Sequence, residues 1–238
     1  MDKIEVSRFL PKEFRAAESL KTLRTNLMYS GEKVKVIGIT SFGASDGKTT
    51  ISFHLAASFA QAGKRVLLLD TDLRKSTLQK RLKVSGQVEG LSHYLMGKAN
   101  VNELMCGTDV PGLFVMFAGE TTANAAELLG GNSFKKLIPA LRDVFDYVIV
   151  DVAPLGQVID CAVIAPELDG TAIIIDIEKN SYKQVRRVQS QLEMTNAKIL
   201  GVVLNRVNFH DRNSYYAREY GYGNYGYGYG EEKRQSNR

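Results

Sequence analysis

A short run of residues near the start of the chain has the composition of a phosphate-binding loop. The run Asp46-Gly47-Lys48-Thr49-Thr50 follows small residues and comes directly before a helical pattern of apolar residues. In such a loop, backbone amides and a helix N-terminus face an anionic phosphate, the lysine neutralises the outer phosphates, and the threonine hydroxyl lies where Mg²⁺ binds. The full GxxxxGK[ST] pattern is not met, because Phe42 stands at the first glycine position. The order of the surrounding elements nevertheless favours a nucleotide site over a chance helix start with a solvated lysine.

Acidic residues follow two other apolar runs of the chain. Asp70 and Asp72 come after the run 66–69, and Asp151 ends the run 147–150. A carboxylate at the end of a buried strand is the usual Mg²⁺-side partner of a phosphate loop. In an extended chain, Asp70 and Asp72 point the same way and repel each other unless a metal or a proton donor compensates. Beside a metal, one could orient a metal-bound water and the other could take a hydroxyl proton. A turn with solvated aspartates is the alternative.

The elements that must position these residues are apolar runs that alternate with helical patterns. This alternation predicts an α/β fold with a mainly parallel sheet and helices on both faces. Ligands of such sheets bind beyond the carboxyl ends of the strands, where the acidic residues lie. Strands are expected at about 34–40, 65–70, 113–117, 147–151, 171–175 and 199–204, and helices at 12–29, directly after the phosphate loop, at 133–143 and at 181–194.

Composition narrows the class of protein. The chain has 238 residues, 44% of them apolar, and a net charge of +5. No apolar stretch of membrane-spanning length and no signal peptide are found, so we expect a soluble, cytoplasmic protein that meets a membrane only through a partner. The two cysteines and three histidines have no metal-type spacing. One basic patch could meet an acidic partner, but no pattern supports nucleic-acid binding. The patch consists of Arg74, Lys75, Lys80, Arg81 and Lys83.

Three stretches together resemble the bacterial tyrosine kinases of capsule and exopolysaccharide synthesis, typified by the separate cytoplasmic kinase of Gram-positive bacteria. They are Ser41…Asp46-Gly47-Lys48-Thr49-Thr50, Leu69-Asp70-Thr71-Asp72-Leu73-Arg74-Lys75 and Val150-Asp151-Val152-Ala153-Pro154. The stretch 124–129 is similar to the Asn-Pro-x-Glu-Leu-Leu sequence of that family. The resemblance runs from about Glu18 to Asn205. It implies a P-loop NTPase fold of the deviant Walker type and phosphoryl transfer from Mg-ATP to tyrosine.

The resemblance also implies roles for individual residues. Catalysis would use Lys48 together with Asp70 and Asp72, one of which is the base. Mg²⁺ would be held by Thr49, Asp70 and Asp151. The nucleotide would be bound by Ser45, Asp46, Gly47, Lys48, Thr49, Thr50 and Asn205. Partners implied in the same way are a transmembrane activator of polysaccharide export, further copies in a ring or dimer, and a cognate tyrosine phosphatase.

The tail and the first helix carry the remaining expectations. From residue 211 the chain is rich in tyrosine, glycine and charge, which predicts disorder. Three parts are thus expected: a helical segment over 1–33, a kinase domain over 34–210 and a disordered tail over 211–238. In the first part, Glu18, Lys21 and Arg24 share roughly one helical face and could mediate self-association, or form a solvated face with an internal Glu-Lys pair. The expected autophosphorylation cluster is Tyr215, Tyr216, Tyr220, Tyr222, Tyr225, Tyr227 and Tyr229.

The chain departs from the family pattern at three places. Ser45 stands where the family has glycine, Val152 replaces a threonine after the metal-side aspartate, and Lys21 replaces an arginine. Two other functions stay open beside the kinase. A partitioning ATPase of the same fold group would carry a second lysine early in the phosphate loop, which is missing here. An adaptor of weak activity would fit the departures in the loop.

Overall fold

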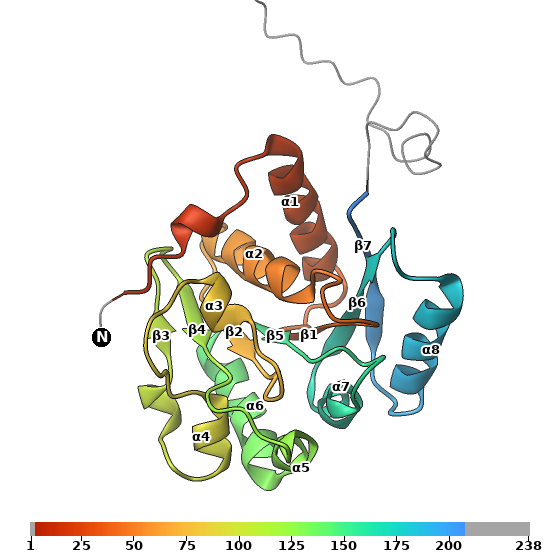
Figure 1. The fold of residues 1–238 in the computed structure, drawn as a ribbon. Coiled ribbons are helices and arrows are strands. Elements are labelled where there is room, and N and C mark those ends of the chain that lie inside the picture. The colour runs from red at the N-terminus through yellow and green to blue at the C-terminus, as the bar shows by residue number, and fades with distance from the viewer. Residues whose placement is uncertain (1–2, 208–238) are drawn as a thin grey trace, which may run out of the picture. The chain divides into compact units, whose positions relative to one another are not determined.

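Seven strands form one sheet in the order β3-β4-β2-β5-β1-β6-β7 (Figure 1), in a computed structural model that describes residues 3–207. Neighbouring strands run parallel except β3 and β4, which pair antiparallel. The predicted, mainly parallel sheet is confirmed, and every predicted strand overlaps an observed one. The strands are β1 (Val36–Ser41), β2 (Val66–Asp70), β3 (Cys106–Gly107), β4 (Leu113–Met116), β5 (Tyr147–Asp151), β6 (Gly170–Asp176) and β7 (Ile199–Asn205).

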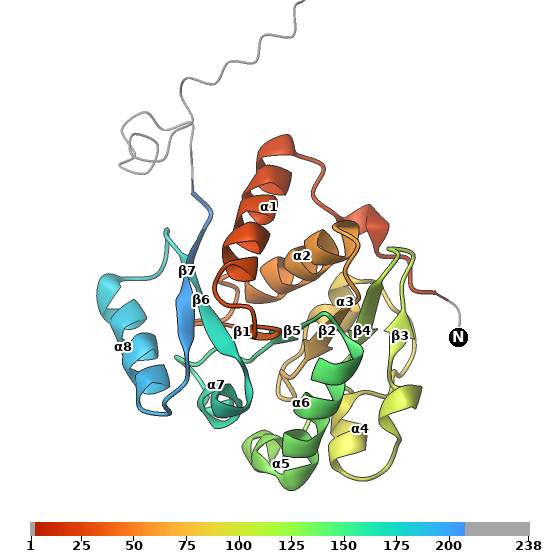
Figure 2. The same cartoon turned by 180° about the vertical axis from the view of Figure 1, so that it is seen from behind.

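Helices cover both faces of the sheet. α1, α2 and α3 pack on one face, and α4 to α8 pack on the other, as Figures 1 and 2 show from opposite sides. The helices are α1 (Phe14–Met28), α2 (Lys48–Gln61), α3 (Leu78–Arg81), α4 (Leu91–Leu95), α5 (Ala125–Gly130), α6 (Asn132–Val144), α7 (Asp160–Ile164) and α8 (Tyr182–Glu193). Single 3₁₀ turns lie at Ser7–Phe9, Val101–Glu103 and Ala165–Glu167.

The apolar strand runs explain this layering. Successive side chains of a strand point to opposite faces, so a strand that is buried on both sides must be apolar at every position. In β2, Val66 and Leu68 pack against the face that carries α2, whereas Leu67 and Leu69 pack against the face that carries α6. All four side chains are fully buried.

The register of the central strands brings distant residues to one edge of the sheet. β2 and β5 are adjacent and parallel, and Asp70 lies directly opposite Asp151. β1 pairs with the other side of β5, with Ile39 opposite Asp151, and the phosphate loop begins where β1 ends. The strand order therefore gathers the loop and both acidic strand ends, as the sequence predicted.

Two features of the helices differ from the sequence-based expectations. The short helices α3, α4, α5 and α7 were not predicted, because four to six residues are too few to show a helical period. The apolar residues of the helix predicted at 12–29 were expected to form one buried stripe, but Phe14 of α1 is 76% exposed. Leu23 and Leu27 of that helix do pack toward the core on α2.

The first residues are tied to the far edge of the sheet. The carboxylate of Asp109 accepts the backbone N–H of the buried residue Val6 at 2.7 Å, and Ile4 forms a bridge to Thr108. Within residues 3–207, no helix is long and apolar enough to cross a membrane. The tyrosine cluster and the predicted disorder of 211–238 lie outside the described residues.

Candidate functional site

The loop between β1 and α2 is closed by its own side chains. Asp46 accepts the backbone N–H of Gly43 at 2.7 Å, and Ser41 donates from Oγ to the Gly43 carbonyl at 2.8 Å. Two loop residues have a positive φ, +66° at Ser45 and +99° at Gly47. Serine at position 45 is therefore held in the backbone region that glycine adopts most easily. The position at which this chain has serine and the family has glycine is therefore one where the backbone conformation favours glycine.

Asn205, the last residue of β7, contacts this loop. Its side-chain amide donates to the Asp46 carbonyl at 2.8 Å. A methyl group added at Gly47 would overlap that amide nitrogen. Glycine is therefore required at position 47 for two reasons, its backbone conformation and the close approach of Asn205. Asn205, which was predicted to bind the nucleotide, thus contacts the phosphate loop and stabilises its backbone conformation.

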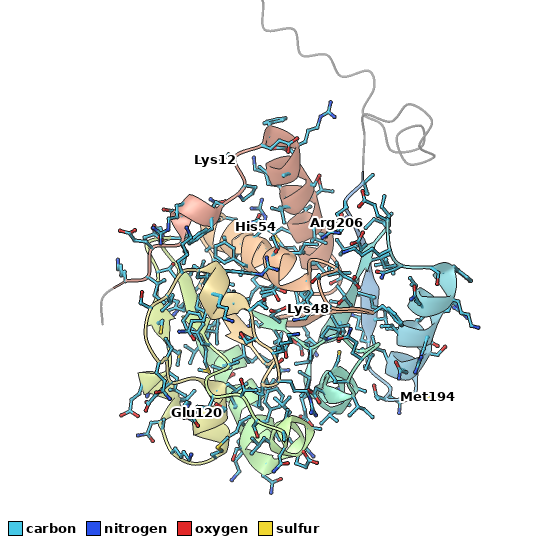
Figure 3. The ribbon with its side chains drawn as sticks, in the orientation of Figure 1. Lys12, Lys48, His54, Glu120, Met194 and Arg206 are labelled. Carbon is cyan, nitrogen blue, oxygen red and sulfur yellow. The ribbon has the colours of Figure 1, made fainter. Side chains whose placement is uncertain are left out.

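Lys48 begins α2 and lies among carboxylates (Figure 3). Its Nζ is 3.3 Å from Asp72 Oδ2, 3.5 Å from Asp151 Oδ1 and 3.3 Å from Thr49 Oγ1. Burial alone would lower the pKa of Lys48, but the nearby charges of Asp151, Asp72 and Asp70 outweigh burial and raise it. Lys48 therefore stays protonated and compensates the acidic cluster.

Asp70 is fully buried beside Asp151 and is held in place by its neighbours. It accepts the hydroxyl of Ser76 and, at 3.1 Å, the backbone N–H of Asp72. Burial, and next the charge of Asp151, raise the pKa of Asp70 to about 7. Around neutral pH this carboxyl is thus poised between its two protonation states in the nucleotide-free protein.

A cavity of about 400 Å³ opens in front of the loop. Asp72 is among its lining residues, and Asp70 and Asp151 are not. Three residues of the basic patch also line the cavity, namely Arg74, Lys75 and Arg81. The rest of the lining comes from Ala44, Ser45, Gly47, Lys48, Thr49, Thr77, Ala153, Pro154, Gln157 and Val158. Of the three aspartates predicted near the strand ends, Asp72 alone reaches the cavity.

Two contacts in the site were not predicted from the sequence. The Ser52 Oγ lies 2.8 Å from the Lys48 carbonyl oxygen and 3.1 Å from Asp151 Oδ1, so its single hydroxyl proton is shared between these two acceptors. Ser52 lies four residues after Lys48, which places both on one face of α2, and this spacing could have indicated its role from the sequence. Arg74 forms a two-bond ion pair with Asp160, at 2.8 and 3.0 Å. No motif marks Asp160, which lies far from Arg74 in the chain.

The other predicted residues lie around the site or on α1. Thr50 accepts a hydrogen bond from Arg81 at 2.9 Å, which ties α3 to the first turn of α2. On α1, Lys21 and Glu18 form an exposed pair at 2.6 Å. Arg24 does not share their open face, because its guanidinium donates to the Ser58 carbonyl of α2 at 2.7 Å.

These groups suit a phosphate and a hard divalent cation. Loop amides and Lys48 supply positive charge at a helix N-terminus, and the hydroxyl of Thr49 and the carboxylate of Asp151 are oxygen ligands of the kind that Mg²⁺ prefers. Among residues 3–207, no group of three or more His, Cys, Asp or Glu is arranged to hold a metal by itself. Mg²⁺ is usually bound through one or two carboxylates together with phosphate oxygens and water.

Comparisons with known proteins agree with this geometry. A family model described as an AAA domain matches residues 34–201. The tyrosine-protein kinase CpsD of Streptococcus agalactiae is 38% identical over 213 residues, which cover 89% of this chain and 90% of that protein. The putative tyrosine-protein kinase CapB of Staphylococcus aureus is 31% identical over 202 residues, which cover 84% of this chain and 88% of that protein.

A solved structure extends the similarity to three dimensions. The kinase domain of the Escherichia coli tyrosine kinase ETK superposes with a TM-score of 0.78 at 28% identity. The match covers 87% of this chain and 84% of that domain. The P-loop fold that these comparisons share binds nucleotides, typically with Mg²⁺.

Proposed function

The chain belongs to the family of bacterial tyrosine-protein kinases, and from this premise we propose that it phosphorylates its own tyrosine-rich tail with Mg-ATP and regulates the synthesis and export of a polysaccharide. One observation carries the proposal: Lys48 at the start of α2 contacts Asp72 and Asp151 at the edge of a phosphate-loop cavity. Seven of the chain's eleven tyrosines lie between residues 215 and 229 and supply acceptors.

Each residue of the site has a distinct role in the proposed reaction. Lys48 and the loop amides bind the outer phosphates and stabilise the charge that develops on them during transfer. The hydroxyl of Thr49 and the carboxylate of Asp151 would hold Mg²⁺, which, when bound, supplies further neutralisation of phosphate charge. Ser52 orients Asp151 through its hydroxyl.

We assign the base to Asp72 rather than to Asp70. Asp72 lines the cavity, so an acceptor hydroxyl could reach it, and its Oδ1 is fixed by the backbone N–H of Lys75 at 2.9 Å. Asp70 is fully buried and is not among the residues that line the cavity. In this assignment, Asp70 shapes the charge around Lys48 and Asp151 and does not meet the acceptor.

Transfer of phosphate to the tail is tested with Lys48→Met. This variant should form no phosphotyrosine with Mg-ATP, as measured by mass spectrometry of the tail, whereas Lys98→Met, which changes an exposed lysine, should match wild type. Full tail modification by Lys48→Met would refute the proposed site. Phosphate release by wild type without any phosphotyrosine would instead favour a partitioning-type ATPase.

Transfer between copies is tested by mixing two variants. Inactive Lys48→Met protein is incubated with an active protein that lacks residues 211–238. Modified tails on the Lys48→Met chains would support transfer between copies, since assembly raises the effective concentration of the acceptor tyrosines. Unmodified tails in that mixture, together with modified tails on wild-type protein alone, would show that each chain phosphorylates only itself.

Assembly is proposed to involve α1 and to respond to phosphorylation. Each phosphate adds about −1.5 to −2 charge, so seven would add on the order of −10 to −14 to a chain of net charge +5. Like-charged tails in one assembly would repel, so ATP should lower the mass measured by light scattering. The α1 surface is tested with Lys21→Glu, because a change at Arg24 would also break its contact with α2. An unchanged mass in Lys21→Glu would leave α1 as an ordinary solvated helix.

We further propose a transmembrane activator and a tyrosine phosphatase as partners. The kinase would then lie at the inner face of the membrane only through that activator. In cells, the protein should fractionate with membranes when an activator is co-expressed and remain in the supernatant without one. Membrane fractionation in a host that lacks any such partner would contradict this localisation.

A further inference from the structure

Arg74 joins three segments that surround the cavity. Its Nε and Nη2 donate to the two oxygens of Asp160 at 2.8 and 3.0 Å, and its Nη1 donates to the Ala123 carbonyl at 3.2 Å. Asp160 begins α7, Ala123 precedes α5, and Arg74 belongs to the loop between β2 and α3. Segments that are far apart in the chain therefore meet at one guanidinium.

The pair is built as a rigid contact. The side chain of Asp160 is completely buried, whereas that of Arg74 is 33% exposed and lines the cavity. A buried carboxylate needs hydrogen bonds to both oxygens, and the planar fork of arginine supplies them in one fixed geometry. The position of the Arg74 guanidinium is thus dictated by Asp160.

The loop held by this pair carries Asp72. Arg74 follows Asp72 by two residues, and Leu73 between them accepts the backbone N–H of Thr122 at 2.9 Å. The segment 122–123 therefore touches the loop twice, once through the backbone and once through Arg74. These contacts tie the loop that carries Asp72 to the segment before α5.

We propose that Asp160 is a positioning residue for phosphoryl transfer, which acts through Arg74 to hold Asp72 at the cavity wall. This rests on the proposed role of Asp72 as the base. A displacement of a catalytic group by about 1 Å can lower a rate on the order of a hundredfold. The carboxylate of Asp160 is bound by Arg74, whereas the ammonium of Lys48 lies against Asp72 and Asp151. Loss of the Asp160 charge should therefore slow transfer more than it weakens binding of the nucleotide.

The first test compares two Arg–Asp ion pairs, one at the cavity and one away from it. Asp160→Asn keeps the shape of the side chain but sets an amide against guanidinium N–H groups. At saturating Mg-ATP, its single-turnover rate of tail phosphorylation should fall about 10- to 100-fold, while the dissociation constant for Mg-ATP changes less than about threefold. The control is Asp169→Asn, since Asp169 pairs with Arg142 at 2.8 Å away from the cavity. It should lower the melting temperature but leave the rate of the folded protein unchanged.

The second test changes the arginine and does not depend on the folding of Asp160→Asn. Arg74→Ala removes the bonds to Asp160 and to the Ala123 carbonyl, so its single-turnover rate of tail phosphorylation should fall at least as far as that of Asp160→Asn. Arg74→Lys keeps the charge but not the fork, and should transfer at about a tenth of the wild-type rate.

The outcomes separate this inference from the proposed function. If wild type phosphorylates its tail and Lys48→Met does not, the proposed kinase site is supported. If Asp72→Asn transfers phosphate at the wild-type rate, the assignment of Asp72 as the base is wrong. If Asp72→Asn is slow, but Arg74→Ala or a folded Asp160→Asn variant keeps the wild-type rate, only the positioning role of Asp160 fails.

Discussion

Gly47→Ala should destabilise the nucleotide-free protein more than a change at an ordinary glycine with positive φ. Two effects add at this position. A side chain in the left-handed region costs about 1–2 kcal/mol per residue, and φ at Gly47 is +99°. The new methyl group must also displace the amide of Asn205, which breaks its hydrogen bond to the Asp46 carbonyl.

The lost hydrogen bond sets the expected excess. A typical protein hydrogen bond contributes about 0.5–1.5 kcal/mol net. Alanine also lowers the entropy of the unfolded chain, which returns about 0.4–1 kcal/mol at any glycine. Gly63→Ala is the matched control, because Gly63 has a φ of +80° and a methyl group added there would enter open space. Gly47→Ala should therefore cost about 1 kcal/mol more than Gly63→Ala, the net contribution of one hydrogen bond.

A double-mutant cycle isolates the contact with Asn205. Free energies of unfolding are measured by urea titration of five proteins. They are wild type, Gly47→Ala, Gly63→Ala, Asn205→Ala and the double variant that combines Gly47→Ala with Asn205→Ala. The atoms nearest to a Cβ added at Gly47 all belong to Asn205, so its removal should reduce the cost of Gly47→Ala to that of Gly63→Ala. If Gly47→Ala costs no more than Gly63→Ala, or if the Asn205→Ala background gives no relief, this account of the loop is refuted.

Three further predictions concern the acidic cluster and α1. Because burial and then the charge of Asp151 raise the pKa of Asp70 from 3.8 to about 7, the folded state keeps a proton that the unfolded chain loses. The free energy of unfolding without nucleotide should thus fall as pH rises between these values, and Asp70→Asn should flatten that slope in urea titrations at several pH values. Asp151→Asn should raise the Mg²⁺ concentration needed for half-maximal transfer, whereas Asp72→Asn should slow transfer at every Mg²⁺ concentration; loss of nucleotide binding in both would contradict this division. Arg24→Ala removes the bond to the Ser58 carbonyl, so the amides of α1 should exchange with deuterium faster in the variant than in wild type; equal exchange in the two proteins would show that this contact does not anchor α1.

The sequence predicted the parts of the structure that depend on local patterns. Long apolar runs identified the strands, since a strand buried on both faces must be apolar throughout. The loop around Lys48 was recognised by its composition between a strand and a helix. The meeting of Asp70 and Asp151 followed from a general property of parallel sheets, in which strand ends share one edge.

Other parts could not be predicted because they depend on tertiary contacts. The orientation of Arg24 is set by Ser58 on another helix, so helical spacing alone placed it on the wrong face. The bond from Arg74 to Asp160 joins segments whose proximity only the folded sheet creates. Only the structure could show which of Asp70 and Asp72 lines the cavity, since both lie at the end of the same strand, β2.

The order of the strands also has a consequence for the synthesis of the protein. β1 lies between β5 and β6, with Val36 opposite Val148 and Ile37 opposite Gly170. A ribosome that has made the chain only as far as α6 has released the whole phosphate loop, yet neither neighbour of β1 exists. The backbone N–H and C=O groups on both edges of β1 then have no partner strand, and such edges can pair with other chains and cause aggregation. We therefore expect the phosphate loop to bind ATP only after β5 and β6 have emerged from the ribosome and paired with β1.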